Sequence, residues 1–270
     1  MTALTMVELE RVERRVLGAL SVVDATTGVR ILDGVALASD ADVRLQRNGS
    51  GLYVIVHADA LVAQESSFAP PTAPAIGSVS IGVRIDDTFG RYLPRLATVA
   101  LPRDPTPADD PPAGSLFASV ALALYPSASA RTGANWATLR VTATETHTGD
   151  ALGGALLSVT VGGNVVARGL TDWRGEALVA VPGIAVTTWS DDPGEVVAFE
   201  TAASVQLLFD PAAGTRTPAA QVVAGKPPAT LPCVDPDAIA ANAASLNSVS
   251  ANASLATGRS QPLSLTLALP

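Results

Sequence analysis

The two histidines are the first residues to consider for metal binding or proton transfer. His57 ends an expected strand, and His147 lies in an expected turn. A zinc site needs several His, Cys or carboxylate ligands at a spacing such as H-x-x-E-H, and the sequence around each histidine does not supply them. We therefore expect both imidazoles to be hydrogen-bonded or solvent-facing side chains, with no metal.

The sequence lacks the common motifs of covalent catalysis and phosphate binding. It contains no G-x-S-x-G nucleophile elbow and no G-x-x-x-x-G-K-[ST] phosphate loop. The glycine pairs Gly153-Gly154 and Gly162-Gly163 lie between expected strands, where tight turns explain them. The single cysteine, Cys233, has no partner for an intrachain disulfide and no neighbouring base in the sequence. We expect no catalytic residue and no cofactor.

Three pairs of adjacent acids could contribute to a calcium site, namely Asp86-Asp87, Asp109-Asp110 and Asp191-Asp192. Calcium takes about six to eight oxygen ligands, which one pair cannot provide. We therefore favour solvated loop charges. A carboxylate pair for glycoside hydrolysis is defined by its separation in space, so the sequence leaves that alternative open without pointing to it.

Three tryptophans stand out in a chain whose aromatic content is only 4%. Trp136 starts an expected strand, and we expect it in the core because a buried indole removes much apolar area from water. Trp173 and Trp189 lie in turns, where an exposed indole stacks on sugar rings. Core packing or edge capping is the favoured interpretation for both. The alternative makes Trp173 and Trp189 candidate ligand-stacking residues for a glycan.

Composition and charge narrow the classes of partner. The net charge of -8 argues against nucleic acid as a partner. The sequence shows no signal-peptide pattern and no uninterrupted apolar run of about 18 residues. We expect synthesis in the cytoplasm without a signal peptide, no membrane span, and no nucleic-acid partner.

Apolar alternation and turn residues predict an all-β protein. Val79, Ile81, Val83 and Ile85 share one face of an expected strand. The Asn48-Gly49 step between two strand-like runs predicts a hairpin. Many such short runs are separated by Gly, Pro and Asp, which is the pattern of β-sandwiches.

A proline-rich stretch suggests how the chain divides. Residues 102–114 hold five prolines, which cannot donate to a sheet ladder, so this stretch is expected to be a semi-rigid linker or an exposed crossover. The expected organisation is an N-terminal extension at 1–15, a first sandwich at 16–101, the linker at 102–114, a second sandwich at 115–230 and a C-terminal extension at 231–270.

The C-terminal extension is expected to contain a helix followed by a strand. Asp235-Pro236 suits a helix N-terminus, and Ile239, Ala243, Leu246 and Val249 have helix-like spacing. The strand that follows places four leucines on one face, where its own sandwich or a neighbouring chain's sheet must cover them. Its own sandwich is the favoured cover. The candidate partner-binding residues are Leu263, Leu265, Leu267 and Leu269.

Two segments resemble a known family. Residues 152–159 (LGGALLSV) and 167–177 (ARGLTDWRGEA) resemble the carboxypeptidase regulatory-like domain, which has a transthyretin-like (prealbumin-like) β-sandwich. The chain has Glu176-Ala177 where many members place a phenylalanine, so core filling there should differ. The resemblance, in residues 138–183, implies this sandwich for the second half, and the similar order of strands and turns in the first half suggests a related sandwich there. The expected fold is therefore two Ig/transthyretin-like β-sandwich domains with a short C-terminal helix-plus-strand extension. The resemblance also implies a module without catalytic activity.

A second, weaker resemblance concerns assembly. The segments 47–55, 91–95, 101–104 and 133–136 look like accessory proteins of contractile, phage-tail-like injection particles. This resemblance implies a non-enzymatic structural protein that contacts other subunits or forms a homo-oligomer, in a particle released by lysis. The alternative is a carbohydrate- or ligand-binding β-sandwich module.

Overall fold

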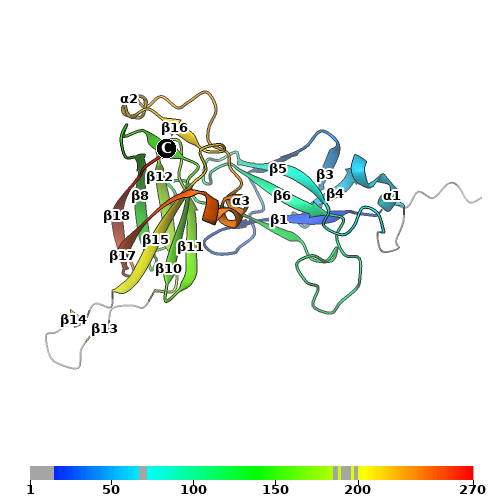
Figure 1. The fold of residues 1–270 in the computed structure, drawn as a ribbon. Helices are drawn as coiled ribbons and strands as arrows, with labels where there is room; N and C mark the ends of the chain where they lie inside the picture. The colour runs from blue at the N-terminus through cyan, green and yellow to red at the C-terminus, as the bar shows by residue number, and fades with distance from the viewer. Residues whose placement is uncertain (1–14, 67–71, 185–187, 190–195, 198–199, 270) are drawn as a thin grey trace, which may run out of the picture. The chain divides into compact units, whose positions relative to one another are not determined.

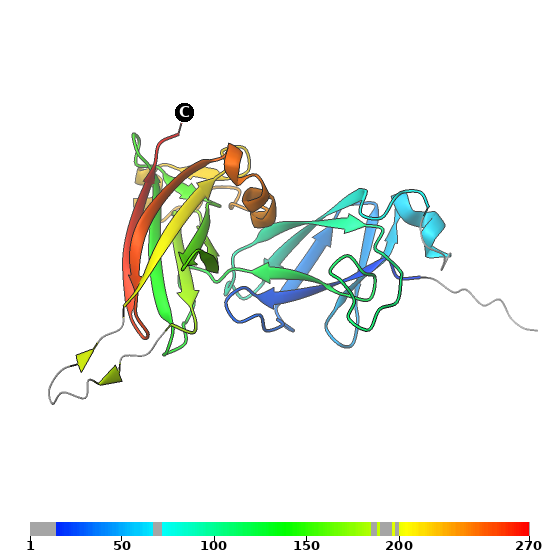
Figure 2. The same cartoon turned by 60° about the horizontal axis from the view of Figure 1, so that its bottom comes forward.

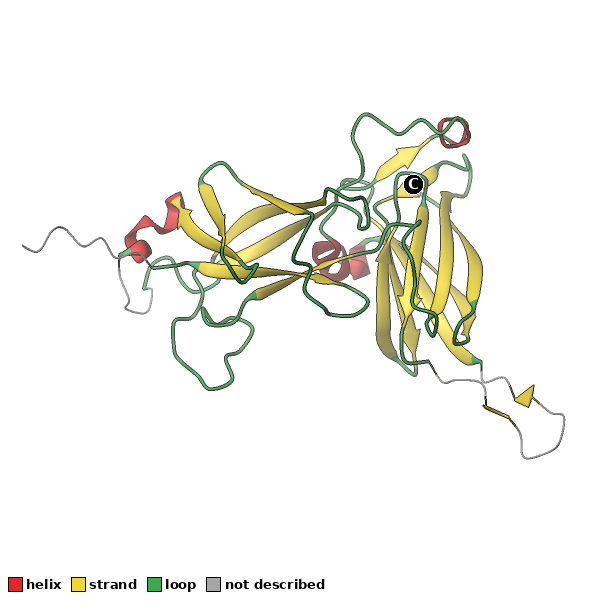
Figure 3. Ribbon diagram, turned by 180° about the vertical axis from the view of Figure 1, so that it is seen from behind, coloured by secondary structure: helices red, strands yellow, loops and turns green. Residues whose placement is uncertain are grey.

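The computed structural model describes residues 15–66, 72–184, 188–189, 196–197 and 200–269. Strands dominate this part of the chain, which confirms the prediction of an all-β protein (Figure 1, Figure 3). The strands are β1 (Gly18–Asp24), β2 (Val35–Ser39), β3 (Val43–Arg47), β4 (Tyr53–Ala58), β5 (Val79–Asp87), β6 (Arg95–Leu101), β7 (Val120–Leu124), β8 (Ala137–Glu145), β9 (Ala151–Gly153), β10 (Leu156–Val161), β11 (Asn164–Leu170), β12 (Glu176–Val181), β13 (Thr188–Trp189), β14 (Val196–Val197), β15 (Thr201–Phe209), β16 (Thr215–Thr217), β17 (Asn247–Leu255) and β18 (Ser260–Leu267). The helices are η1 (Asp59–Leu61), α1 (Val62–Glu65), α2 (Ala219–Val223), α3 (Pro236–Ala241) and η2 (Ala243–Ser245).

The chain divides into two compact units, and each is built from separate stretches of sequence. Unit 1 comprises Met1–Ser21, Ser39–Ile81 and Val99–Val120, and unit 2 comprises Val22–Ala38, Gly82–Thr98 and Ala121–Pro270. The proline-rich segment 102–114 belongs to unit 1, where it forms the crossover from β6 to β7.

The buried Arg103 holds this crossover in place. Its Nε donates to the carbonyl of Ser115 at 2.9 Å, and its Nη2 donates to the carbonyls of Ala113 and Ala118. Three backbone acceptors around one guanidinium fix a segment whose prolines cannot supply donors of their own. The crossover is therefore anchored to β6 by side-chain hydrogen bonds.

The hairpin predicted at Asn48-Gly49 is confirmed in unit 1. β3 and β4 pair antiparallel on either side of residues 48–52. The side-chain oxygen of Asn48 accepts hydrogen bonds from the backbone N–H of Ser50 and Leu52, which closes the turn.

The alternation predicted for β5 is also confirmed. Ile81, Val83 and Ile85 are buried, whereas the residues between them are exposed. A strand with this pattern has one face on the core and one face in solvent.

Unit 2 contains two sheets packed around one core (Figure 2). One sheet has the order β11-β10-β15-β17. The other has the order β12-β8-β9-β16, with β18 added parallel to β8. Leucine, valine and alanine side chains from both sheets fill the space between them, and Phe209 is the one aromatic residue among the buried members of this cluster.

The prediction that the helix continues beyond residue 241 is wrong. α3 ends at Ala241, and after η2 the chain enters β17. β17 pairs along its full length with β15, from Thr201↔Leu255 to Phe209↔Asn247. Within β17 the apolar residues recur at every second position, as a strand requires. The pairing of β17 with β15 outweighs the helix-like spacing of the residues from Ile239 to Val249. The C-terminal region therefore supplies one short helix and two strands of unit 2.

Carboxylates close two further turns between strands. Asp24 accepts from the N–H groups of Thr26 and Thr27, and Glu145 accepts from those of His147 and Thr148. Such side-chain acceptors fix a loop without further packing.

Asp172 closes a third turn in the same way. Its Oδ1 accepts from the N–H groups of Arg174 and Glu176. Gly175 follows within this turn at a φ of +73°, where an added Cβ would lie 2.3 Å from the carbonyl oxygen of Ala143. Only glycine fits there.

Among the described residues, no helix combines the length and the apolar character that crossing a membrane requires.

Candidate functional site

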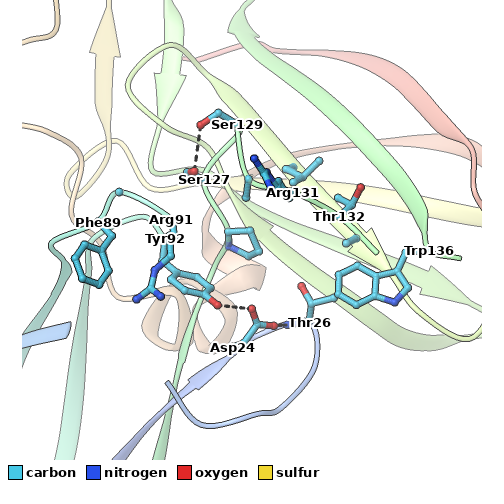
Figure 4. Close-up of a pocket in the computed structure, with 15 residues that line it drawn as sticks. Asp24, Thr26, Phe89, Arg91, Tyr92, Ser127, Ser129, Arg131, Thr132 and Trp136 are labelled. Atoms are coloured by element: carbon cyan, nitrogen blue, oxygen red, sulfur yellow. Dashed lines mark hydrogen bonds between the residues drawn. The ribbon is translucent and has the colours of Figure 1, made fainter. Parts of the chain in front are cut away.

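A cavity of about 430 Å³ opens on unit 2, and all of its lining residues belong to that unit (Figure 4). Ligand pockets usually measure roughly 300–1,000 Å³, so this cavity is large enough for a small organic ligand. Its most distinctive side chains are Asp24, Arg91, Tyr92, Arg131 and Trp136.

Backbone hydrogen bonds build the wall that carries Tyr92. Tyr92 and Pro126 form an antiparallel bridge, in which the N–H of Leu93 donates to Tyr125 and the N–H of Ser127 donates to Arg91. These bonds measure 2.9 and 2.8 Å. Two strand-like segments are thereby held side by side, and the position of the Tyr92 ring follows from them.

The phenol of Tyr92 is fixed at its far end by Asp24. The hydroxyl donates to Oδ2 of Asp24 at 2.7 Å (Figure 4). Burial raises the pKa of the Tyr92 phenol, and the carboxylate that accepts its proton raises it further. Because Oδ1 of Asp24 already accepts from Thr26 and Thr27, both oxygens of this carboxylate are engaged.

Trp136 lies on the opposite side of the cavity from Phe89 and Tyr92 (Figure 4). It is half-buried and precedes β8, so it is not the fully buried core residue that the sequence predicts. Its indole rests on the backbone of Gly133, where an added Cβ would meet Cε2 at 2.8 Å. The backbone N–H of Trp136 donates to Gly133, and its carbonyl accepts from Gly258. The indole therefore packs against Gly133, where any larger residue would displace it.

Leu178 and Ala180 of β12 also line the cavity. Along β12 they alternate with Ala177, Val179 and Val181, which belong to the core cluster of unit 2, so they lie on the other face of the strand. Even so, Leu178 is only 1% exposed and Ala180 only 4% exposed. The cavity thus contains apolar surface of the sheet.

The two arginines at the cavity differ in what they contact. Arg91 donates to both carboxylate oxygens of Asp87 and to the carbonyl of Asp33, and its guanidinium lies 4.8 Å from the Phe89 ring centroid. Arg131 is exposed, and within the part of the chain that the structure describes it makes no ion pair. Arg131 is therefore the guanidinium with unused donors at this site.

This arrangement of side chains suits binding. Aromatic faces contact apolar or C–H-rich surfaces of a ligand, and hydroxyl and guanidinium groups orient its polar atoms. The one carboxylate of the lining, Asp24, is held by a turn and by Tyr92. A pair of carboxylates for acid–base chemistry is not found among the lining residues.

No family model, no curated protein and no solved structure matches this chain.

The two tryptophans that the sequence offered as ligand-stacking residues belong to different elements, Trp173 to the turn before β12 and Trp189 to β13. Trp173 is half-buried beside a cavity of about 40 Å³, far below the usual size of a ligand pocket. Trp189 belongs to β13, which pairs with β14, and its side chain lies outside the described residues.

The four candidate partner-binding leucines, three in β18 and Leu269 just beyond it, face the core of unit 2. Leu265 and Leu267 are each 3% exposed, and Leu263 and Leu269 are partly buried against the same cluster. β18 pairs with β8 of its own chain from Ser260↔Thr138 to Leu267↔Glu145. The leucines of this strand are therefore covered by the chain's own unit 2. This is the cover that the sequence analysis favours.

His57 contacts two acids in unit 1. Its Nδ1 lies 2.6 Å from Oε1 of Glu65, and its Nε2 lies 2.9 Å from Oδ1 of Asp59. These contacts join β4 to η1 and α1. The imidazole of the exposed His147 makes no ion pair within the described residues, and its backbone N–H donates to Glu145. The described residues contain no group of three or more His, Cys, Asp or Glu side chains that could hold a metal ion.

Of the three acid pairs, Asp86-Asp87 makes contacts with nearby arginines. Asp86 pairs with Arg84 at 2.7 Å, and Asp87 accepts from Arg91. Asp109-Asp110 is exposed, and Asp191-Asp192 lies outside the described residues.

Sequence reasoning did not find Tyr92 and Arg131. The signal for Arg131 was the polar stretch Arg131-Thr132-Gly133, which stands just before a tryptophan. Tyr92 had no local signal, because only the bridge to Pro126 and the contact with Asp24 bring it to this cavity.

Proposed function

We propose that this chain is a non-enzymatic β-sandwich binding protein and that the cavity beside Trp136 is its ligand site. The observation that carries the proposal is the grouping of Tyr92, Trp136 and Arg131 around a space of about 430 Å³. Pockets of this size with aromatic walls and a few polar groups are the usual sites of small ligands. The proposed architecture is two Ig/transthyretin-like sandwiches, and the abundance of strands supports it.

The use of the acids in unit 2 supports a binding role over a catalytic one. Asp24, Glu145 and Asp172 each accept backbone N–H groups in a turn between strands. A carboxylate that is held by its own turn stiffens a loop and is poorly placed to transfer protons to a substrate. Rigid loops around a cavity lower the entropic cost of binding.

Thermal unfolding of the full chain tests the proposal. The chain is heated alone and with each member of a panel of neutral saccharides, acidic saccharides and short peptides. A ligand present at about 100 times its Kd stabilises the folded state by about 2.7 kcal/mol. We expect at least one class to raise Tm for the wild type and for Trp173→Phe, and to have no effect on Trp136→Ala. If no class raises Tm, or if Trp136→Ala responds like the wild type, the proposal fails.

A second proposal is that the chain is a subunit of a multi-protein particle, such as a contractile phage-tail-like injection system. Two adjacent valines of β11, Val165 and Val166, support it, because they are 52% and 42% exposed on a strand at the end of its sheet. The pairing of β11 with β10 shifts register there, between Ala167 and Val165, which leaves Val166 without a partner residue. Exposed apolar residues on an edge strand favour contact with another chain.

Light scattering measures this association directly. We expect the pure chain to self-associate as its concentration rises, and the double variant Val165→Lys/Val166→Lys to stay monomeric. A control variant at an exposed apolar residue of α2, Val223→Lys, should associate like the wild type. A wild type that is monomeric at every concentration contradicts self-association through β11.

A further inference from the structure

The indole of Trp136 presents one face to the cavity, because its other side is covered. Gly133 lies against the ring so closely that a Cβ would reach Cε2 at 2.8 Å and Cδ2 at 2.9 Å. An aromatic face that is fixed in this way is suited to the C–H groups on one side of a pyranose ring, because such stacking needs a flat and rigid surface.

Hydroxyl groups stand around the same space. Thr26, Ser127, Ser129 and Thr132 line the cavity, and each is at least partly exposed. The hydroxyls of Ser127 and Ser129 lie 3.4 Å apart (Figure 4). A hydroxyl both donates and accepts, as the hydroxyl groups of a sugar do. The polar part of the lining therefore matches a saccharide better than a purely apolar ligand.

Arg131 adds a positive charge on the same side of the cavity as Ser129 and Thr132 (Figure 4). Its guanidinium has no ion-pair partner among the described residues, in contrast to Arg91, which Asp87 and Asp33 hold. The planar fork of a guanidinium matches a carboxylate with two parallel hydrogen bonds. Asp24 is the only acid of the lining, and its two oxygens already accept hydrogen bonds, so a single negative charge opposes an anionic group there.

We propose that the cavity binds an acidic saccharide, with Trp136 against a sugar ring and Arg131 on the ring's carboxylate. This inference rests on the proposed function and adds the chemical class of the ligand. The net charge of the chain is -8, so general electrostatics disfavours an anion and the local guanidinium must provide the attraction. The selectivity for a charged sugar therefore depends on one side chain.

Calorimetric titration of the full chain tests the inference. The probes are trisaccharides of galacturonate, glucuronate and mannuronate, each paired with its uncharged methyl ester. We expect at least one acid to bind about ten- to a hundred-fold more tightly than its ester, as a charge-assisted bidentate pair would provide. Raising the salt concentration should weaken the binding of the acid and leave that of the ester nearly unchanged.

Matched variants show whether Arg131 causes the preference for the acid and whether the Trp136 indole contributes to binding of both acid and ester. Arg131→Gln should bring the acid down to the affinity of its ester, whereas Arg30→Gln, which removes an exposed charge outside the cavity lining, should change nothing. Gly133→Ala should weaken acid and ester alike, because the added methyl displaces the indole. Gly49→Ala is its control, because a Cβ at Gly49 has open space.

The outcomes distinguish the inference from the proposed function. Equal affinity for acid and ester, or an Arg131→Gln variant that keeps the preference for the acid, overturns the acidic saccharide. A neutral saccharide or a peptide that binds through Trp136 overturns it as well, but leaves the binding function standing. If no probe of any class binds, both fail.

Discussion

The Nη2 of Arg95 lies 2.7 Å from Oδ2 of Asp237, and this contact joins β6 to the first turn of α3. The guanidinium is 1% exposed, and it also donates to the carbonyls of Leu96 and Ala123, each at 2.9 Å. Its second carboxylate neighbour is Asp235, the N-cap of α3. A single buried side chain therefore connects three segments of unit 2.

Replacing Arg95 with methionine should lower the free energy of unfolding by about 2–4 kcal/mol, because two partly buried carbonyls lose their donor and Asp235 loses its buried cationic partner. Urea denaturation measures this change. Asp237→Asn is the matched control and should cost less, because the Asp237 side chain is 66% exposed and Arg95 keeps its two carbonyl acceptors and Asp235. An Arg95→Met variant no less stable than Asp237→Asn contradicts this role for Arg95.

Glu145 should make the protein sensitive to acid. Backbone N–H groups of His147 and Thr148 lower the pKa of Glu145 to about 2, from a usual value of 4.5. Because the folded-state pKa is depressed, the unfolded chain binds more protons between these two values. The stabilisation is complete above pH 4.5 and is lost as the pH falls toward 2.

Acid titration of Glu145→Gln checks that Glu145 causes a loss of stability as the pH falls. The variant cannot ionise at this position, so its stability should fall less steeply than that of the wild type as the pH is lowered. Denaturant midpoints measured between about pH 6 and pH 2 give both slopes. Parallel curves for the two proteins would show that Glu145 is not a source of the acid sensitivity.

Alanine substitutions at Gly175 and Gly162 distinguish the cost of backbone strain from the cost of a steric clash. Both have positive φ, +73° and +57°, but a Cβ at Gly162 has open space whereas one at Gly175 meets the carbonyl of Ala143. Gly162→Ala should cost about 1–2 kcal/mol, which is the strain of the left-handed conformation. Gly175→Ala should cost more, since the turn must also move. Equal losses in thermal unfolding would mean that the clash relaxes freely.

Leu265 should stabilise unit 2 through β18. It is 3% exposed, so Leu265→Ala should cost about 2–5 kcal/mol through lost burial and a residual cavity. Leu263→Ala is the comparison in the same strand, because Leu263 is only partly buried. Chemical denaturation ranks the two variants. If both are as stable as the wild type and lose association, β18 docks on another chain.

Sequence patterns predicted the strands well where the turn chemistry was local. The Asn48 hairpin and the Asp172 turn depend on side chains that bind their own backbone within four residues. Period-two alternation predicted β5 for the same reason, because its signal lies within the strand. Such features need no knowledge of distant neighbours.

Features that depend on distant pairing could not be predicted in this way. β17 pairs with β15, which lies some forty residues earlier, and its alanines and serines carry a weak local signal. The cavity likewise joins Asp24 to Tyr92 and places Trp136 beside β12. Trp136 was predicted to be in the core because an indole is large, but the turn at Gly133 holds it at the cavity instead.

Fluorine NMR of the full chain labelled with 5-fluorotryptophan tests the ligand site most directly. The Trp136 resonance is identified by its loss in Trp136→Phe, and the uronate trisaccharides are then added one at a time. We predict that at least one shifts the Trp136 resonance in a saturable manner and leaves the Trp173 resonance in place. A Trp136 resonance that no ligand moves, or a shift confined to Trp173, would contradict a binding site beside Trp136.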